Sequence, residues 1–213
     1  MFPGGKVGLD DHRWRGRCPA SRRLDDAALA LRVAAIRETF EECGILLARG
    51  AGGGMVAPDA LRSFDGDGPR STFESVIGTG RLELAVDLLI PFAHWITPAG
   101  LPMRFDTHFF LAPAPPGQVA ALDGREVVAL RWTTPAAAIA KGAGLDLMLP
   151  TRLNLAKLGR FGTVAAALAG ARAAPVVTVE SKLVQTPTGP AYEIPEAAGY
   201  GISLVPVAET GRR

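Results

Sequence analysis

The sequence has few cysteines, little net charge and no long apolar run, and each absence excludes a class of protein. Cys18 and Cys43 are the only cysteines among 213 residues, too few for a disulfide framework or a cysteine metal site. The formal net charge is only +2, so a basic nucleic-acid binder is not indicated. The most apolar stretch, residues 82–96, contains two acidic residues and a proline. It falls short of the roughly 18 uninterrupted apolar residues of a membrane helix, so no membrane partner is expected.

The amino terminus and the composition favour a folded cytoplasmic protein. Residues 1–6 contain no apolar segment of the kind that a secretory signal needs, so the cytoplasm is the expected location. Hydrophobic residues make up 48% and charged residues 21% of the chain, which is the balance of a globular protein. At roughly 150 residues per domain, the length predicts one domain.

Apolar periodicity predicts a mixture of helices and strands. A helix is expected over 25–42, because Leu29, Val33, Ile36 and Phe40 recur at helical spacing and form one apolar stripe. Further helices are expected over 58–64, 72–90 with a break at 78–80, 135–141, 151–159 and 163–172, and strands over 45–47, 93–97, 104–111, 127–132 and 176–185. Strands mixed with helices of ordinary length indicate an α/β or α+β fold.

Three glutamates lie on the polar side of the helix expected over 25–42. At about 100° per residue, Glu38, Glu41 and Glu42 fall within a single arc opposite the apolar stripe. Like charges at this spacing repel, and near a helix C-terminus the backbone dipole disfavours anions. A divalent cation would remove both penalties, and oxygen ligands suit Mg²⁺ or Mn²⁺. On the cluster alone, a metal site and a solvated acidic face both stay open.

The helix motif resembles part of a known catalytic motif. Residues 37–45 read RETFEECGI and are similar to the second half of the Nudix box, found in hydrolases of diphosphates linked to another group. Gly4 and Gly5 resemble the opening of that box, and Asp11 stands where the family usually has a glutamate. The segment 12–36 is longer than the corresponding part of the usual box. This expanded box resembles the Nudix branch that cleaves coenzyme A and acyl-coenzyme A.

The resemblance to this branch continues downstream and covers most of the chain. It is carried by HWITP at 94–98, RFDTHFF at 104–110 and LPTR at 149–152. It implies an α/β Nudix fold, an α/β/α sandwich with a mixed central sheet, as a single domain over residues 1–213. A box insertion is expected at about residues 12–24, and a C-terminal helical and strand extension from about residue 150. Because the family usually has one or two strands before the glycine pair, the expectation is either a start assigned too late or an N-terminally truncated variant.

The resemblance also implies a mechanism. Glu38, Glu41 and Glu42 would be ligands of Mg²⁺ or Mn²⁺, helped by the carbonyl of Gly4. Glu38 would be a ligand or the base that deprotonates the attacking water, and Arg37 would orient a glutamate through a bidentate pair. The favoured substrate is coenzyme A or acyl-coenzyme A. The alternatives are a nucleotide sugar, ADP-ribose or dinucleotide substrate, or a non-catalytic module that binds a nucleotide. The expected partner is a small-molecule diphosphate, and a homodimer is compatible with the sequence.

Two further features have both a functional and a structural interpretation. Arg22 and Arg23 end an arginine-rich run over 12–23 that could contact the phosphates of coenzyme A, or could be a solvated insertion. Glu126 precedes the strand expected over 127–132, where it could reach the metals as an additional acid or be an ordinary strand-end charge.

The histidines of the expected strands are interpreted as satisfied or surface residues rather than ligands. His94 lies between aromatic residues, and His108 shares one strand face with Asp106. No spacing of His and Cys suggests zinc. Trp95 and Trp132 are expected in the core.

Overall fold

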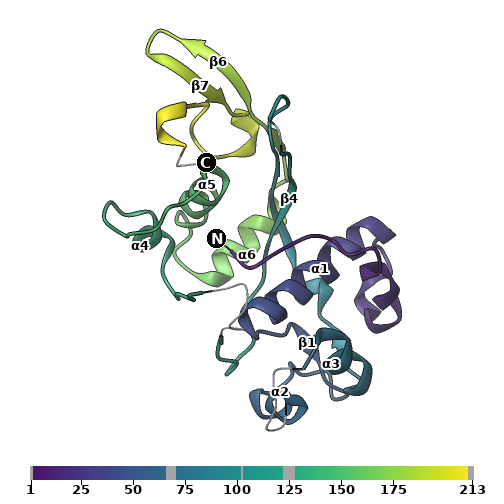
Figure 1. The fold of residues 1–213 in the computed structure, drawn as a ribbon. Coiled ribbons are helices and arrows are strands. Elements are labelled where there is room, and N and C mark those ends of the chain that lie inside the picture. Colours follow the sequence, from purple (N-terminus) through teal and green to yellow (C-terminus); the bar gives the residue numbers. More distant parts are fainter. Residues whose placement is uncertain (1, 66–70, 102, 122–127, 211–213) are drawn as a thin grey trace. The chain divides into compact units, whose positions relative to one another are not determined.

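The structure is a computed structural model that describes residues 2–65, 71–101, 103–121 and 128–210 (Figure 1). The chain divides into two compact units. We call them the box unit, with Pro3–Leu89 and Ala112–Arg131, and the sheet unit, with Met1–Phe2, Ile90–Leu111 and Trp132–Arg213.

The box unit is mainly helical. In chain order it contains the 3-10 helices η1 (Asp11–Arg17) and η2 (Pro19–Ser21), then α1 (Asp26–Cys43), β1 (Ala48–Arg49), α2 (Pro58–Asp65), α3 (Phe73–Thr79), β2 (Glu83–Leu84) and η3 (Val86–Leu88). The two short strands pair antiparallel, with Ala48 opposite Leu84. The expected insertion at 12–24 therefore folds into 3-10 turns.

Helix α1 begins and ends where its sequence predicts. The side chain of Asp25 accepts a hydrogen bond from the backbone N–H of Ala28 at 2.7 Å, which caps the N-terminus. Gly44 adopts a left-handed conformation with φ of 69°, which suits a glycine directly after a helix. The prediction of a helix over 25–42 is confirmed to within one residue.

The apolar stripe of α1 forms the centre of the box unit. Leu29, Val33 and Ile36 are fully buried, and Phe40 is nearly so. The ring of Phe40 packs against that of Phe73 in α3, with centroids 6.4 Å apart. Burial of this face leaves the glutamate face of the helix for other contacts.

Two of the sequence predictions for the box unit are wrong. Residues 45–47 are buried but irregular, and the strand begins only at Ala48. The break expected at 78–80 is confirmed, because α3 ends at Thr79, Gly80 follows and Arg81 takes a positive φ of 47° that a right-handed helix cannot contain, but the helix expected beyond this break does not form. The chain then continues as β2 and η3.

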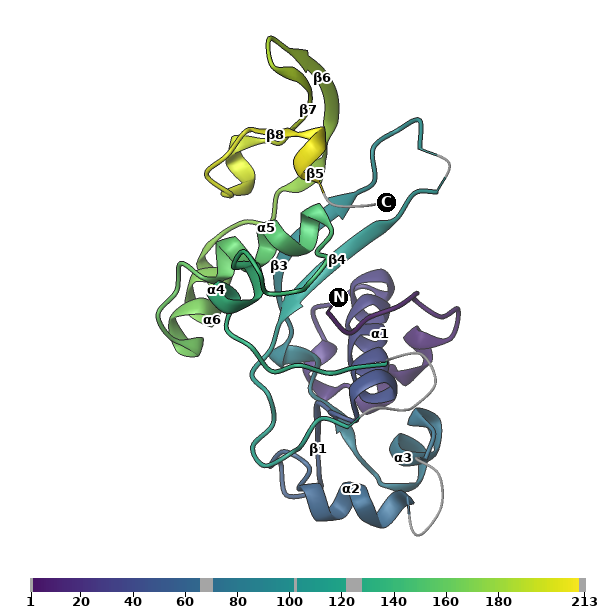
Figure 2. The ribbon, with the colours of Figure 1, turned by 60° about the vertical axis from the view of Figure 1, so that its left-hand side comes forward.

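The sheet unit contains a mixed sheet and a separate antiparallel sheet (Figure 2). Its elements are β3 (Ile90–Ile96), β4 (Asp106–Leu111), α4 (Pro135–Ile139), α5 (Leu149–Leu158), α6 (Val164–Ala173), β5 (Thr178–Glu180), β6 (Lys182–Thr186), β7 (Gly189–Glu193), η4 (Glu196–Ala198), β8 (Leu204–Pro206) and η5 (Val207–Glu209). Strand β3 pairs antiparallel with β4 and parallel with β5, so the predicted mixed sheet is confirmed. Strands β6, β7 and β8 form the second sheet.

One face of the mixed sheet is buried in the core of the sheet unit. Trp95 and Val179, on neighbouring strands, are buried together with Leu153 of α5 and Ala171 of α6. The strand expected over 127–132 is absent from the described residues 128–132, and Trp132 is 72% exposed rather than in the core. No helix within the described ranges is both long and apolar enough to cross a membrane.

Candidate functional site

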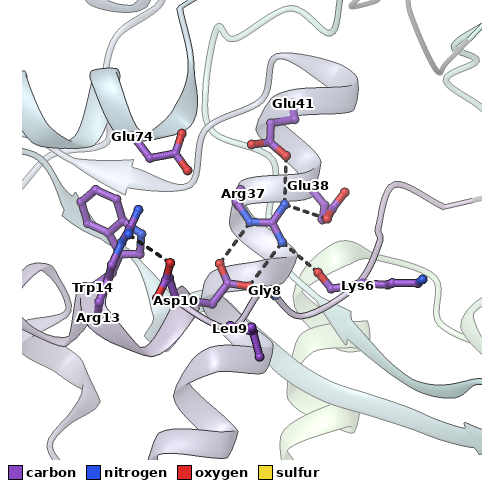
Figure 3. Close-up of a pocket in the computed structure, with 11 residues that line it drawn as sticks. Lys6, Gly8, Leu9, Asp10, Arg13, Trp14, Arg37, Glu38, Glu41 and Glu74 are labelled. Atoms are coloured by element: carbon purple, nitrogen blue, oxygen red, sulfur yellow. Dashed lines mark hydrogen bonds and ion pairs between the residues drawn. The ribbon is translucent and has the colours of Figure 1, made fainter.

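The guanidinium of Arg37 is the centre of the predicted box cluster (Figure 3). Its Nε and Nη2 donate to the two carboxylate oxygens of Asp11 at 3.1 and 3.3 Å. Its Nη1 donates to Glu38 Oε1 at 2.7 Å and to Glu41 Oε2 at 3.0 Å. Its Nη2 also donates to the backbone carbonyl of Lys6 at 2.8 Å. One cation therefore holds three carboxylates, and the bidentate partner is an aspartate rather than a glutamate.

Asp11 anchors this network from the insertion. It lies at the start of η1, is only 4% exposed, and accepts a further hydrogen bond from the backbone N–H of Gly8 at 2.7 Å. A buried carboxylate with charge-assisted bonds from both a guanidinium and a backbone amide is held in one orientation. Sequence reasoning placed Asp11 in the motif but did not identify it as the partner of Arg37.

The glycine pair lies against the glutamates of α1. The backbone N–H of Gly4 donates to Glu42 Oε2 at 3.2 Å. A Cβ atom on Gly5 would lie 2.5 Å from the carboxylate of Glu38, so a larger residue here would displace that carboxylate from its observed position. The structure thus bonds Glu38 and Glu41 to Arg37, and bonds Gly4 to Glu42 on the same helix.

A cavity of about 400 Å³ opens beside the cluster. Its acidic lining residues are Asp10, Asp11, Glu38, Glu41 and Glu74, and its basic lining residues are Lys6, Arg13 and Arg37. Figure 3 shows the carboxylate of Glu74, from α3, directed toward this space. Sequence analysis did not identify Glu74, since nothing in its local pattern predicts that α3 presents it to α1.

The cluster holds more negative charge than Arg37 can offset. Burial raises the pKa of Glu41, and the carboxylates of Glu38 and Glu74 raise it further, against the opposing effect of Arg37. Burial alone would lower the pKa of Arg37, but its bonds and charge interactions with Asp11 and Glu38 outweigh burial and raise it. A divalent cation would relieve the excess charge. Carboxylate oxygens are the hard ligands that Mg²⁺ and Mn²⁺ prefer, so the donor set fits such an ion.

The arginine-rich insertion is partly fixed to the box unit. Arg15 donates to Asp26 at 2.8 Å and to the carbonyl of Leu24 at 3.1 Å. The ring of Trp14 packs edge-on against that of Phe73, with centroids 5.7 Å apart. These contacts hold η1 on the helices of the box unit.

The other predicted binding residues are less constrained. Arg22 and Arg23 follow η2 directly or closely, and both are exposed. Glu126, the predicted additional acid, lies outside the described residues. Neither arginine is placed in the cluster around Arg37 by the contacts of the described residues.

A second group of metal-ligating residue types lies on the mixed sheet of the sheet unit. The ligand atoms of His94, Asp106 and His108 lie within 4.8 Å of one another. Part of this group could be recognised in the sequence, because Asp106 and His108 are two residues apart in a strand and therefore share one face. The register that places His94 directly opposite His108 comes only from the structure.

Comparison with known proteins identifies the family. The family model of the NUDT19 Nudix domain matches residues 19–151. The putative nudix hydrolase 7 of Caenorhabditis elegans is 34% identical over 113 residues, covering 52% of this chain and 32% of that protein. The human acyl-coenzyme A diphosphatase NUDT19 is 29% identical over 136 residues, covering 57% of this chain and 36% of that protein. The chain therefore spans about a third of the length of these curated relatives.

A solved structure supports the same assignment. The crystal structure of a Nudix hydrolase from Alicyclobacillus acidocaldarius matches with a TM-score of 0.63 and 28% identity, covering 79% of each chain. The expectation of a Nudix fold is thereby confirmed. With the family match extending over more than half of the residues, the chain belongs to the Nudix hydrolases.

Proposed function

We propose that this chain is a Mg²⁺- or Mn²⁺-dependent diphosphatase that cleaves coenzyme A or acyl-coenzyme A. The observation that carries the proposal is the placement of Glu38, Glu41 and Glu42 on α1 beside a glycine pair, with Arg37 bonded to Glu38 and Glu41. The match to the NUDT19 Nudix domain and the name of the human relative support the choice of substrate class.

The described residues supply the parts that this chemistry needs. Glu41 and Glu42 would hold the divalent ion, with Glu38 and the carbonyl of Gly4 as further ligands. When bound, such an ion neutralises phosphoryl oxygens and lowers the pKa of a coordinated water. Glu38 is suited to accept the proton of the attacking water, because Arg37 fixes one of its oxygens at 2.7 Å. Arg37 itself positions the carboxylates and does not contact the substrate.

The exposed end of the insertion would select the substrate. Arg22 and Arg23 present guanidinium groups that suit phosphate recognition, and coenzyme A carries an additional phosphate on its ribose. Because the rest of the insertion is fixed to the box unit through Arg15 and Trp14, these two arginines can contribute to binding without remodelling the cluster.

Hydrolysis assays test the proposal directly. Coenzyme A, dephospho-coenzyme A, ADP-ribose and a dinucleotide would be incubated with Mg²⁺ or Mn²⁺ and the products separated. We expect metal-dependent cleavage that favours coenzyme A, and a loss of roughly 10²- to 10⁴-fold in Glu38→Gln, the magnitude typical of removing a general base. The matched control is Glu196→Gln, an exposed glutamate of η4 in the sheet unit, which should retain full activity.

The same assay separates the alternatives. Replacing Arg22 and Arg23 with alanine should raise KM for coenzyme A more than for dephospho-coenzyme A, and equal losses on both would overturn the role of these arginines. Preference for ADP-ribose or a dinucleotide would keep the chemistry and change the substrate. No turnover of any diphosphate by folded protein would instead favour a nucleotide-binding module.

A further inference from the structure

We propose that His94, Asp106 and His108 form a second metal site, for a borderline transition-metal ion such as Zn²⁺, on the mixed sheet of the sheet unit. This residue set is separate from the Nudix carboxylates and takes a different chemical class of ion. Imidazole nitrogens with one carboxylate suit Zn²⁺ and its neighbours in the transition series, whereas the box offers oxygen ligands alone.

The sheet register brings the three side chains to one face. His94 of β3 lies directly opposite His108 of β4, and Asp106 lies two residues before His108 on the same strand. Residues two apart in a strand point to the same face, and directly opposed residues have neighbouring Cβ atoms. The opposite face carries the buried Trp95. The rigid core beneath the sheet therefore fixes the backbone positions of all three residues.

The ligand atoms already converge. The Nε2 atoms of His94 and His108 lie 2.5 and 3.6 Å from Oδ1 of Asp106. Ligand atoms about 2.0–2.1 Å from a tetrahedral zinc ion lie about 3.3 Å from one another, so the observed separations bracket the required one. The two rings are stacked with centroids 3.9 Å apart and planes 13° from parallel, so both edges face the same carboxylate. Small side-chain rotations would bring these groups onto one ion.

A fourth residue orients the first histidine. The Nδ1 atom of His94 lies 2.8 Å from Oγ1 of Thr178, which is paired with His94 across the parallel strand β5. In metal sites the ring nitrogen that does not bind the ion usually donates to such a partner, which fixes the tautomer with Nε2 as the ligand. Thr178 supplies this partner on the far side of the ring from Asp106. An imidazole ring held in one orientation by a hydrogen bond is typical of a preorganised metal site.

The solvent exposure of the three side chains would allow a metal ion to enter the site and to keep one coordination position open to water. The side chain of His94 is 15% exposed, whereas those of His108 and Asp106 are 33% and 63% exposed. Glu180, two residues beyond Thr178, pairs with Arg104 at 2.5 Å and is thereby committed to another contact. Three protein ligands beside solvent are typical of zinc sites that retain a water or accept an anion.

Zinc titration monitored at the histidine rings tests the site. The chain has only three histidines, so a long-range ¹H–¹⁵N spectrum of the full chain resolves each imidazole separately. Addition of Zn²⁺ alone should shift the ring nitrogens of His94 and His108 together, saturating at one equivalent, and leave those of His12 unchanged. The His12→Ala variant assigns the control signal. A shift confined to His12, or no shift of His94 and His108, would overturn the proposal.

Calorimetry of Zn²⁺ binding adds variants with graded effects. His108→Ala, at an exposed position, should eliminate the site, and Asp106→Asn should weaken it strongly. Thr178→Val should weaken binding by roughly 10- to 100-fold, the range for loss of an orienting partner, while circular dichroism confirms that each variant is folded. Unchanged zinc affinity in folded His108→Ala would contradict the proposal. Because both experiments measure zinc binding and not hydrolysis, the outcome is independent of whether the box is catalytic.

Discussion

Asp11 and Arg37 form a charged pair with little exposure in the box unit, whereas the sheet unit buries a neutral chain of hydrogen bonds. In that chain the indole N–H of Trp95 donates to the hydroxyl of Tyr200 at 2.8 Å, and this hydroxyl donates to Oδ1 of Asn154 at 2.7 Å. All three residues of the neutral chain are buried. Both units thus form hydrogen bonds between buried polar groups, but with opposite chemistry, and the neutral chain leaves Nδ2 of Asn154 without a hydrogen-bond partner among the described residues.

The charged network of the box unit can respond to a bound ligand, whereas the neutral chain of the sheet unit stabilises side-chain packing. Burial raises the pKa of Tyr200 to about 12, against the opposing hydrogen bond from Trp95, so this hydroxyl stays neutral near physiological pH. The pKa of Glu41 is also raised by burial, and a cation bound beside this carboxylate would lower it again. We infer that reactive groups are concentrated in the network whose charge state is adjustable, while the neutral chain connects α5 to the mixed sheet.

The largest effect is expected from removing the cation of the charged network. Arg37→Met would leave Asp11 buried without its main partner, which should lower the free energy of unfolding by about 3–5 kcal/mol. Urea denaturation at pH 7 measures the change. The matched control is Arg23→Met. Because Arg23 is exposed, this substitution should change the free energy of unfolding by no more than about 0.5 kcal/mol. A loss below about 1 kcal/mol for Arg37→Met would mean that the pair is not effectively buried.

A smaller effect is expected from breaking the neutral chain. Tyr200→Phe leaves the indole N–H of Trp95 and Oδ1 of Asn154 without this partner, at a cost of about 1–3 kcal/mol. Because no charge is involved, the loss should be the same at pH 5 and pH 8 in urea denaturation.

A second substitution checks this interpretation. Asn154→Leu in the Tyr200→Phe background replaces the amide that lost its hydrogen-bond donor with an apolar side chain. Replacing both polar partners of a hydrogen bond often changes the stability of the protein very little. The double variant should therefore be no less stable than Tyr200→Phe alone. A pH-dependent loss in either variant would show that an ionised group takes part in the neutral chain.

Helix α1 and its glutamates could be predicted because their signals are local. The spacing of Leu29 and Val33 sets the buried face, Asp25 and Gly44 set the ends, and the helical period then places the glutamates together. Each inference uses residues within a few turns of one another. The mixed sheet was likewise expected from the family resemblance, and the prediction that Asp106 and His108 share one strand face is confirmed.

The contacts between distant segments could not be predicted in the same way. Nothing in the local sequence joins Asp11 to Arg37, or places His94 opposite His108, because strand register and helix packing depend on tertiary structure. The failed strand over 127–132 has the same cause: a short apolar run fits a strand only if a neighbouring strand is present. Trp132, at the end of this run, is accordingly exposed rather than in the core.

The smallest effect on stability is expected at the partly solvated ion pair of Arg49 and Asp87 in the box unit. Comparing this pair with the more buried pair of Arg37 and Asp11 tests the effect of burial. Arg49 Nη1 and Nη2 donate to the two oxygens of Asp87 at 2.7 and 2.8 Å, but the carboxylate side chain is 39% exposed. Hydrogen bonding from Arg49 lowers the pKa of Asp87, against the opposing effect of partial burial. Despite similar bidentate geometry, Asp87→Asn should therefore cost less than about 1 kcal/mol at pH 7, well below the loss expected for Arg37→Met.

The sign of the pH dependence follows from the lowered pKa. The folded state binds the proton of Asp87 less readily than the unfolded state, so the stabilisation is present above the unfolded pKa of about 3.9. It is lost as the pH falls through the folded value. Urea denaturation from pH 7 to pH 3 should show the wild type and Asp87→Asn converging below about pH 4. In an Arg49→Met background this convergence should disappear; if it persists, the lowered pKa of Asp87 arises from something other than its guanidinium partner.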